Sequence, residues 1–200
     1  MTELLPSSNA GKLHQRAILS IVILIAAAAR LPGLGSTPPP LNQDEASRGY
    51  DAWCILKTGA DRFGQRWPFF LQSFGPGDYT AALSTYMTVP FVAISGPTPS
   101  AIRLPDALLG TVTVFILYLW LSRRLGSLSA LAAALCLAVD PWHVSITRTA
   151  HEAGYAPFFM VMAIWALDRS GLTDDSGSPT PRHWAFLAGI MLAFHAWVYP

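Results

Sequence analysis

The chain has 200 residues, of which 52% are hydrophobic and only 12% are charged, whereas about a quarter of the residues in a soluble domain carry charge. Its 13 lysines and arginines nearly balance its 12 aspartates and glutamates, which excludes an extended basic surface for nucleic acid. With 7 Trp, 10 Phe and 6 Tyr, the chain carries more apolar surface than one soluble core needs. The composition therefore predicts an all-α, polytopic membrane protein.

Five apolar runs approach the length that crosses a bilayer as a helix, about 20 residues with a range of about 17–25. They are predicted near residues 17–34, 104–121, 125–139, 154–167 and 184–200. No small-x-small cleavage site follows the first run, so we interpret it as a retained signal anchor whose Arg30 snorkels toward the interface. The last run is still apolar at Pro200, so we expect residues 1–200 to be the N-terminal part of a longer domain.

Charge predicts the orientation of these spans. Six cations fall at ends that five alternating spans place on one side: Lys12, Arg16, Arg123, Arg124, Arg169 and Arg182. Short loops rich in lysine and arginine stay in the cytoplasm. The loops of residues 35–102 and 140–153 are therefore predicted to share the extracytoplasmic face, where together they can form one site.

The long loop of residues 35–102 contains two further helical patterns. In residues 45–58 the apolar positions recur every three or four residues, and Gly59 follows as a stop. This pattern predicts a helix lying in the membrane interface, with Tyr50 and Trp53 as anchors. Residues 79–95 could span the membrane or lie in its interface. A span would move the later arginines to the outer side, so an interfacial helix is predicted.

Asp44 and Glu45 are adjacent carboxylates just beyond the first apolar run. One interpretation is structural: Asp44 caps the helix of residues 45–58, because aspartate favours the N-cap. The other interpretation is functional, since a cap at a helix mouth can also face a pocket. Arg48 lies four residues after Asp44, and an exposed pair at this spacing is worth about 0.3–0.5 kcal/mol.

The second outer loop supplies another polar cluster. Arg148 and Glu152 are four residues apart, which predicts that they share a helical face, with His151 beside Glu152. The pair is interpreted either as a salt bridge at a helix start or as a phosphate-binding cation with a second carboxylate. Arg103 has three interpretations: it snorkels, pairs with Asp106, or holds a lipid phosphate.

Several common site motifs are absent from the sequence. There is no nucleotide-binding glycine loop and no H-E-x-x-H zinc motif. Cys54 lies in the long loop and Cys136 in an apolar run, which predicts neither a disulfide nor a zinc site. The apolar runs also lack the midplane charges expected of a proton relay or ion path.

Three motifs occur in order along the chain: Asn42-Gln43-Asp44-Glu45-Ala46 with Arg48-Gly49-Tyr50, then Leu56-Lys57-Thr58-Gly59, then Arg103-Leu104-Pro105. This pattern resembles the N-terminal part of the GT-C membrane glycosyltransferases. Within that group it is similar to the dolichyl-phosphate-mannose–protein mannosyltransferases and the aminoarabinose transferases.

The resemblance implies an inverting transfer from a polyprenyl-phosphate-linked sugar to an acceptor hydroxyl or amine outside the membrane. Asp44 would be the general base, Glu45 would shape the pocket or hold the acceptor, and Arg148 would contact the donor phosphate. The expected substrate-binding residues are Arg48, Tyr50, Arg103, Arg148, His151 and Glu152. No metal ligand set is predicted, and a Mg²⁺ or Mn²⁺ ion between Asp44 and the phosphate stays open.

The resemblance thus implies a mannosyltransferase-like enzyme of the bacterial inner membrane. Its expected partners are the lipid-linked donor, an acceptor protein, lipid or glycan, and membrane lipids, but no nucleic acid. Two alternatives from other classes stay open. The chain could be a transporter or flippase subunit that moves polyprenyl-linked sugars intact, or a membrane scaffold without catalysis.

Overall fold

The computed structural model describes residues 9–172 and 182–198. The helices are α1 Asn9–Arg30, α2 Gln43–Thr58, α3 Leu83–Ser95, α4 Pro99–Arg124, α5 Ser127–Val139, α6 Pro141–Arg148, α7 Ala156–Ser170 and α8 Arg182–Val198. A 3-10 turn, η1 Glu152–Tyr155, joins α6 to α7, and the strands β1 Phe70–Gln72 and β2 Tyr79–Ala81 form an antiparallel hairpin. The predicted helical class is confirmed. The hairpin was not predicted.

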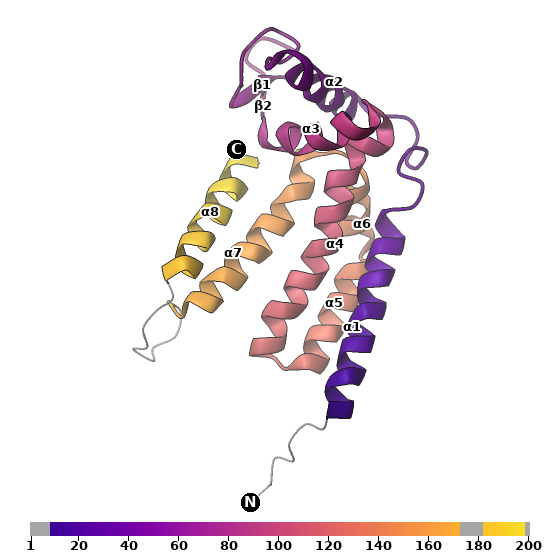
Figure 1. Cartoon of the computed structure of the whole chain (residues 1–200), viewed down its shortest axis with the longest axis vertical. Coiled ribbons are helices and arrows are strands. Elements are labelled where there is room, and N and C mark those ends of the chain that lie inside the picture. The colour runs from indigo at the N-terminus through magenta and orange to yellow at the C-terminus, as the bar shows by residue number, and fades with distance from the viewer. Residues whose placement is uncertain (1–8, 173–181, 199–200) are drawn as a thin grey trace, which may run out of the picture.

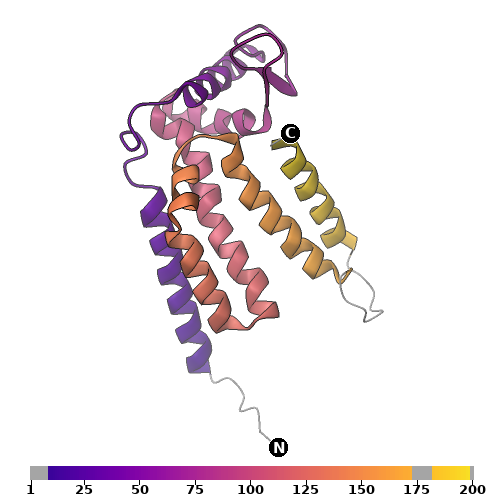
Figure 2. The same ribbon diagram turned by 180° about the vertical axis from the view of Figure 1, so that it is seen from behind.

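The helices α1, α4, α5, α7 and α8 run side by side as a bundle, and α2, α3 and the hairpin form a cap over one end (Figure 1). The view from behind shows the same two parts (Figure 2). Within the bundle α4 packs against α1, α5 and α7, and α7 packs against α8. The turn between α4 and α5, with Arg123 and Arg124, lies at the end away from the cap (Figure 1).

Two helical segments are long and apolar enough to cross a membrane, Gly11–Arg30 and Pro99–Arg124. The bent pair α5 and α6, which meet at 54°, would add a third if it is one span. These segments overlap the first three predicted spans. Helices α7 and α8 cover the last two but have only 15 and 17 residues, and the end of the fifth predicted span lies outside the described residues.

The helix α4 begins earlier than the hydropathy pattern predicts. The Thr98 side chain accepts a hydrogen bond from the Ala101 amide, and Pro99 occupies the first turn. Proline is tolerated there because an N–H in the first turn has no partner within the helix. The connection before α4 therefore ends at Thr98, and Arg103 lies inside the helix.

The break between α5 and α6 is stabilised by Arg30. Pro141 has no N–H, so the last carbonyls of α5 need other donors. Arg30 donates to the carbonyls of Ala138 at 2.8 Å and Leu137 at 3.1 Å, and its Nη2 lies 2.7 Å from His143 Nδ1. Arg30 is fully buried. The prediction that it snorkels to the interface is wrong, because it serves these unpaired carbonyls inside the bundle.

The cap begins with α2, whose ends follow the local sequence. The Asn42 side chain accepts from the Glu45 amide at 2.8 Å, and Glu45 accepts from the Asn42 amide at 3.0 Å. This reciprocal capping box corrects the expectation that Asp44 is the cap, because only the spacing from Asn42 to Glu45 allows it. Gly59 ends the helix in the left-handed conformation with φ 71°, as predicted.

The helix α3 lies across the end of the bundle and packs against α2 and α4 (Figure 1). At 13 residues it is about 20 Å long, against a hydrocarbon core of about 30 Å. It is too short to span, which agrees with the interfacial prediction. The first residues of the predicted segment form β2 instead. The core between α2, α3 and α4 contains Ala52, Val92 and Ala101.

Candidate functional site

Two buried ion pairs fix α2 to α4. Arg103 of α4 donates to both carboxylate oxygens of Glu45 of α2, at 2.6 Å and 2.9 Å. In the second pair the cation is on α2: Arg48 donates to Asp106 of α4 at 3.0 Å. No more than 5% of any of these four residues is exposed. Because each helix contributes one cation and one anion, the crossing is neutral overall while every charge has a partner.

Glycines allow the helices to approach closely enough for these pairs to form. A Cβ atom on Gly49 would lie 2.2 Å from Cδ1 of Ile102, and one on Gly154 would lie 3.1 Å from Oδ1 of Asp106. Side chains at these positions would push α2 or η1 away from α4. The motif Arg48-Gly49 therefore combines an ion-pair donor with a contact point.

The remaining donors of Arg103 bind the chain that enters α2. They reach the carbonyls of Leu34 at 3.0 Å, Pro38 at 2.6 Å and Pro40 at 3.3 Å. The expectations that Arg103 snorkels or pairs with Asp106 are wrong. The geometry gives this side chain a structural role, because it is buried and its five hydrogen bonds all go to groups of the protein.

Arg148 also binds backbone carbonyls. It donates to Ala29 and Arg30 at 3.1 Å each, to Pro32 at 2.9 Å and to Thr37 at 3.0 Å. The predicted pairing of Arg148 with Glu152 is wrong, because α6 ends at Arg148 and the chain is extended before η1 begins. Arg148 holds the segment after α1 in place, so its geometry does not favour a phosphate contact.

A narrow polar recess lies between α2 and the rest of the cap. One face of α2 lines it at positions i, i+3, i+4 and i+7. The lining residues are Asp44, Ser47, Arg48 and Asp51 of α2, Leu71 and Thr80 of the hairpin, Ser73, Ser84, Thr85 and Glu152. The recess thus brings Asp44 and Arg48 of the first predicted outer loop together with Glu152 of the second.

The charges in this recess differ in their accessibility. Asp44 is exposed, whereas Arg48 is buried and its Nη2 has no hydrogen-bond partner among the described residues. Glu152 Oε2 lies 3.9 Å from that nitrogen. Burial alone would lower the pKa of Arg48, but Asp106, Tyr155 and Glu152 outweigh it and raise the pKa. The recess therefore offers an accessible carboxylate beside a permanent, incompletely paired cation.

Asp51 also lines the recess and was not predicted as a site residue. Its carboxylate accepts from the Arg62 amide at 3.1 Å. Arg62 in turn donates to the carbonyls of Gln72 and Ser73 at the end of β1. Burial raises the pKa of Asp51, against the opposing effect of Arg62. The polar stripe at positions 44, 47, 48 and 51 was the signal that could have revealed it.

Three other predicted site residues, Glu45, Tyr50 and His151, do not line the recess. Glu45 accepts from the Ala150 amide at 3.0 Å as well as from Arg103, which gives it a structural position. Tyr50 is 57% exposed and is not among the residues lining the recess. His151 caps η1 and borders a separate hollow beside Trp142. Among residues 9–172 and 182–198, no group of three His, Cys, Asp or Glu side chains could hold a metal ion.

Comparison with known proteins decides the family. A family model described as dolichyl-phosphate-mannose-protein mannosyltransferase matches residues 80–197, more than half of the chain. The chain belongs to this family. The predicted resemblance is therefore confirmed, and the mannosyltransferase family has a GT-C membrane fold. No curated protein matches the chain. The family match includes Arg103, Asp106 and Glu152, whereas Asp44 and Arg48 precede it.

Proposed function

We propose that the protein transfers a sugar, with inversion, from a polyprenyl-phosphate-linked donor to an acceptor hydroxyl or amine at the outer face of the membrane. Membership of the mannosyltransferase family implies a glycosyltransferase that uses lipid-linked sugars. One observation carries the residue assignment: Asp44 and Arg48, one helical turn apart on α2, border the same polar recess.

In this proposal Asp44 is the general base. Its carboxylate takes the proton from the acceptor O–H or N–H while the acceptor atom attacks the anomeric carbon of the sugar. The bond between that carbon and the phosphate oxygen breaks, and polyprenyl phosphate leaves with the bonding electrons. A phosphate is a good leaving group, so it needs a cation nearby more than it needs a general acid.

Arg48 takes the phosphate-binding role that the resemblance implied for Arg148. Arg48 lines the recess, and its Nη2 has no hydrogen-bond partner among the described residues, whereas Nη1 and Nη2 of Arg148 donate to backbone carbonyls. A buried donor without a partner costs about 1–3 kcal/mol. A phosphate oxygen would satisfy it with a charge-assisted hydrogen bond, and Asp106 would keep the guanidinium in position.

The proposed location is the bacterial inner membrane, with the cap on the extracytoplasmic side. Sugar nucleotides do not cross membranes, so transfer on that side needs a donor carried by a lipid. The acceptor is a protein, lipid or glycan that reaches the cap from outside. Mannose is the proposed sugar because of the family to which the chain belongs.

The decisive experiment is the Asp44→Asn variant of the protein, assayed with radiolabelled polyprenyl-phosphate mannose. Loss of a general base lowers turnover by about 10²–10⁴-fold, and folding should be unchanged because Asp44 is exposed. The matched control is Asp78→Asn, which removes an exposed carboxylate at the hairpin turn, outside the recess. Transfer by Asp44→Asn at the wild-type rate would contradict the proposal.

The same assay separates the proposed enzyme from a flippase. A transferase releases free polyprenyl phosphate and moves the label to the acceptor, whereas a flippase leaves the donor intact and changes only its leaflet. A scaffold does neither. Donor that is moved but never cleaved would therefore replace our proposal with the transport function.

A further inference from the structure

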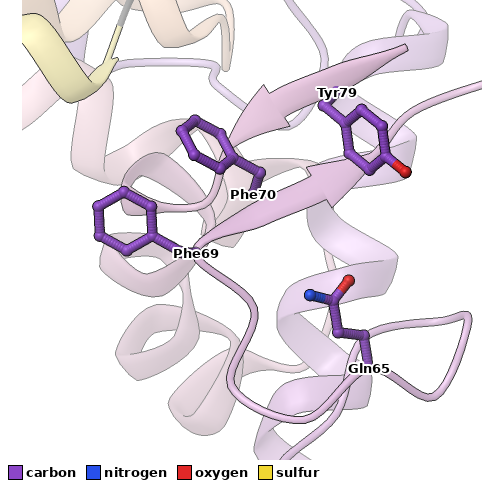
Figure 3. A pocket seen from close by; sticks show the side chains of 4 residues that line it. All are labelled: Gln65, Phe69, Phe70 and Tyr79. Carbon is purple, nitrogen blue, oxygen red and sulfur yellow. The ribbon is translucent and has the colours of Figure 1, made fainter. Parts of the chain in front are cut away.

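The segment between α2 and α3 exposes an unusual number of aromatic rings. Six aromatic residues are each at least 40% exposed: Phe63, Trp67, Phe69, Phe70, Phe74 and Tyr79. Three of them, Phe69, Phe70 and Tyr79, line a hollow together with Gln65 (Figure 3). We call these three the hairpin aromatic patch. Contiguous apolar surface of this kind marks a contact with a protein, a ligand or a membrane.

The hairpin aromatic patch is distinct from the polar recess. In the hairpin, Leu71 pairs with Thr80 and Gln72 pairs with Tyr79. Side chains alternate between the faces of a strand, so Phe70 and Tyr79 lie on the face opposite Leu71 and Thr80. The latter two line the recess. Phe70 and Tyr79 therefore lie behind the recess wall, and none of the three patch residues lines the recess.

The patch continues into the helical bundle. The ring of Phe69 stacks on that of Trp197 with centroids 4.1 Å apart and planes 9° from parallel. The indole nitrogen of Trp197 donates to the Phe69 carbonyl at 3.1 Å. Trp197 lies in the last turn of α8, and that end of α8 reaches the cap beside the hairpin (Figures 1 and 2). The hairpin thus meets the bundle at the level where its helices end.

We propose that the hairpin aromatic patch binds membrane lipid at the boundary between headgroups and acyl chains of the leaflet next to the cap. Two observations favour lipid over a protein or glycan. Through the Phe69–Trp197 stack the patch joins α8, which exposes the apolar side chains of Phe186 and Leu192, and the patch is built from aromatic rather than aliphatic side chains. Tyr and Trp concentrate at this depth of a bilayer because each ring is apolar with one polar group; Tyr79 in the patch and Trp197 beside it are of this kind, and the two Phe rings add apolar surface.

With this contact the hairpin is held from two sides. Arg62 and Asp51 connect it to α2 on the recess side, and lipid holds it from the opposite side. The wall formed by Leu71 and Thr80 is then fixed relative to the membrane surface. The inference concerns the membrane contact alone and does not depend on sugar transfer.

Nitroxide labelling of the whole chain in phosphatidylethanolamine–phosphatidylglycerol vesicles tests the proposal. In a Cys54→Ser, Cys136→Ser background, a label is placed by Phe70→Cys, and its collisions with oxygen and with a water-soluble nickel chelate are measured. Two controls bracket the scale: Leu24→Cys on the exposed face of α1, and Asp78→Cys at the exposed hairpin turn. We expect the oxygen-to-nickel collision ratio at position 70 to lie several-fold above that at 78 and below that at 24.

Two results would overturn the proposal. A ratio at position 70 equal to that at 78 would place the patch in water. Protection from both reagents would mean that protein covers it. If the Phe70→Cys variant does not fold, as judged by its helical circular dichroism, Tyr79→Cys provides the second labelling position on the same face, with the same expected ratio and the same contradicting results.

Discussion

At the scale of single residues, two adjacent carboxylates have different environments. Glu45 is 1% exposed and bound by Arg103, whereas Asp44 is exposed at the mouth of the recess. A carboxylate that must accept a proton from a substrate has to be reachable, and Asp44 meets this condition. Glu45 positions the helix that carries Asp44.

We therefore predict that Glu45→Gln destabilises the protein while Asp44→Asn does not. Removing one partner of a buried ion pair leaves Arg103 uncompensated and costs about 3–5 kcal/mol. Thermal unfolding in detergent should show a clearly lower midpoint for Glu45→Gln and the wild-type midpoint for Asp44→Asn. The double variant Glu45→Gln, Arg103→Met should recover part of the loss. Equal midpoints for the two single variants would refute the assignment.

The environment of Glu45 also predicts a pH dependence. Burial alone would raise its pKa, but hydrogen bonds from Arg103 and from the Ala150 and Asn42 amides outweigh this effect, and the pKa is lowered from 4.5. Ionised Glu45 therefore contributes stability above the unfolded pKa, and the contribution is lost as the pH falls through the lower, folded pKa.

We expect the unfolding midpoint of the wild-type protein to drop as the pH falls below about 4.5, measured by circular dichroism in detergent. Glu45→Gln has no carboxylate to protonate, so its midpoint should change less over the same range. Parallel acid profiles for the two proteins would show that other groups control acid unfolding.

The sequence predicted which residues line the recess better than it predicted their partners. Asp44, Arg48 and Glu152 were selected from their position in outer loops, and the recess contains all three. The partners were assigned by spacings of three or four residues, which describe contacts within one helix. The ion pairs of Arg48 and Arg103 instead join residues 58 apart, and no local periodicity encodes such a contact.

At the scale of elements, the crossing of α2 over α4 depends on Gly49. An alanine there would place its Cβ 2.2 Å from Cδ1 of Ile102. Overpacking of this kind costs about 1–3 kcal/mol, so Gly49→Ala should lower the unfolding midpoint. Gly189→Ala in α8 is the matched control, since among the described residues no atom outside its own stretch of helix lies within 4 Å of its added Cβ.

Rescue distinguishes a local clash from a general helix effect. Ile102→Val removes the Cδ1 atom, so Gly49→Ala with Ile102→Val should lose less stability than the sum of the single changes. Strict additivity would mean that Gly49 and Ile102 do not limit the approach of the two helices.

The elements that could be predicted are those with a long or strongly marked pattern. The helix α2 was predicted to within two residues because its apolar period and Gly59 are both local signals. The hairpin was missed since each strand has three residues, too few for an alternating pattern to stand out. Its closure depends on Arg62, which binds the end of β1 and Asp51 of α2.

At the scale of the whole molecule, hydropathy predicted where the helices lie, and charge predicted which of their ends gather together. The turn between α4 and α5 and the start of α1 lie at the end of the bundle away from the cap (Figure 1). The cations counted in the sequence are therefore separated from the recess by the length of the bundle. The tilt of each helix and the helices it packs against could not be predicted, because apolar side chains face both lipid and protein.

The orientation of the bundle gives the last prediction. The cationic end, with Lys12, Arg16, Arg123 and Arg124, should face the cytoplasm, since short basic loops are retained there. In the background without native cysteines, a membrane-impermeant maleimide applied to intact cells should label Asp78→Cys at the hairpin turn. It should leave Ser127→Cys at the start of α5 unlabelled until the membrane is permeabilised. The reverse pattern would place the recess in the cytoplasm, where a sugar nucleotide could serve as donor and a lipid carrier would not be needed.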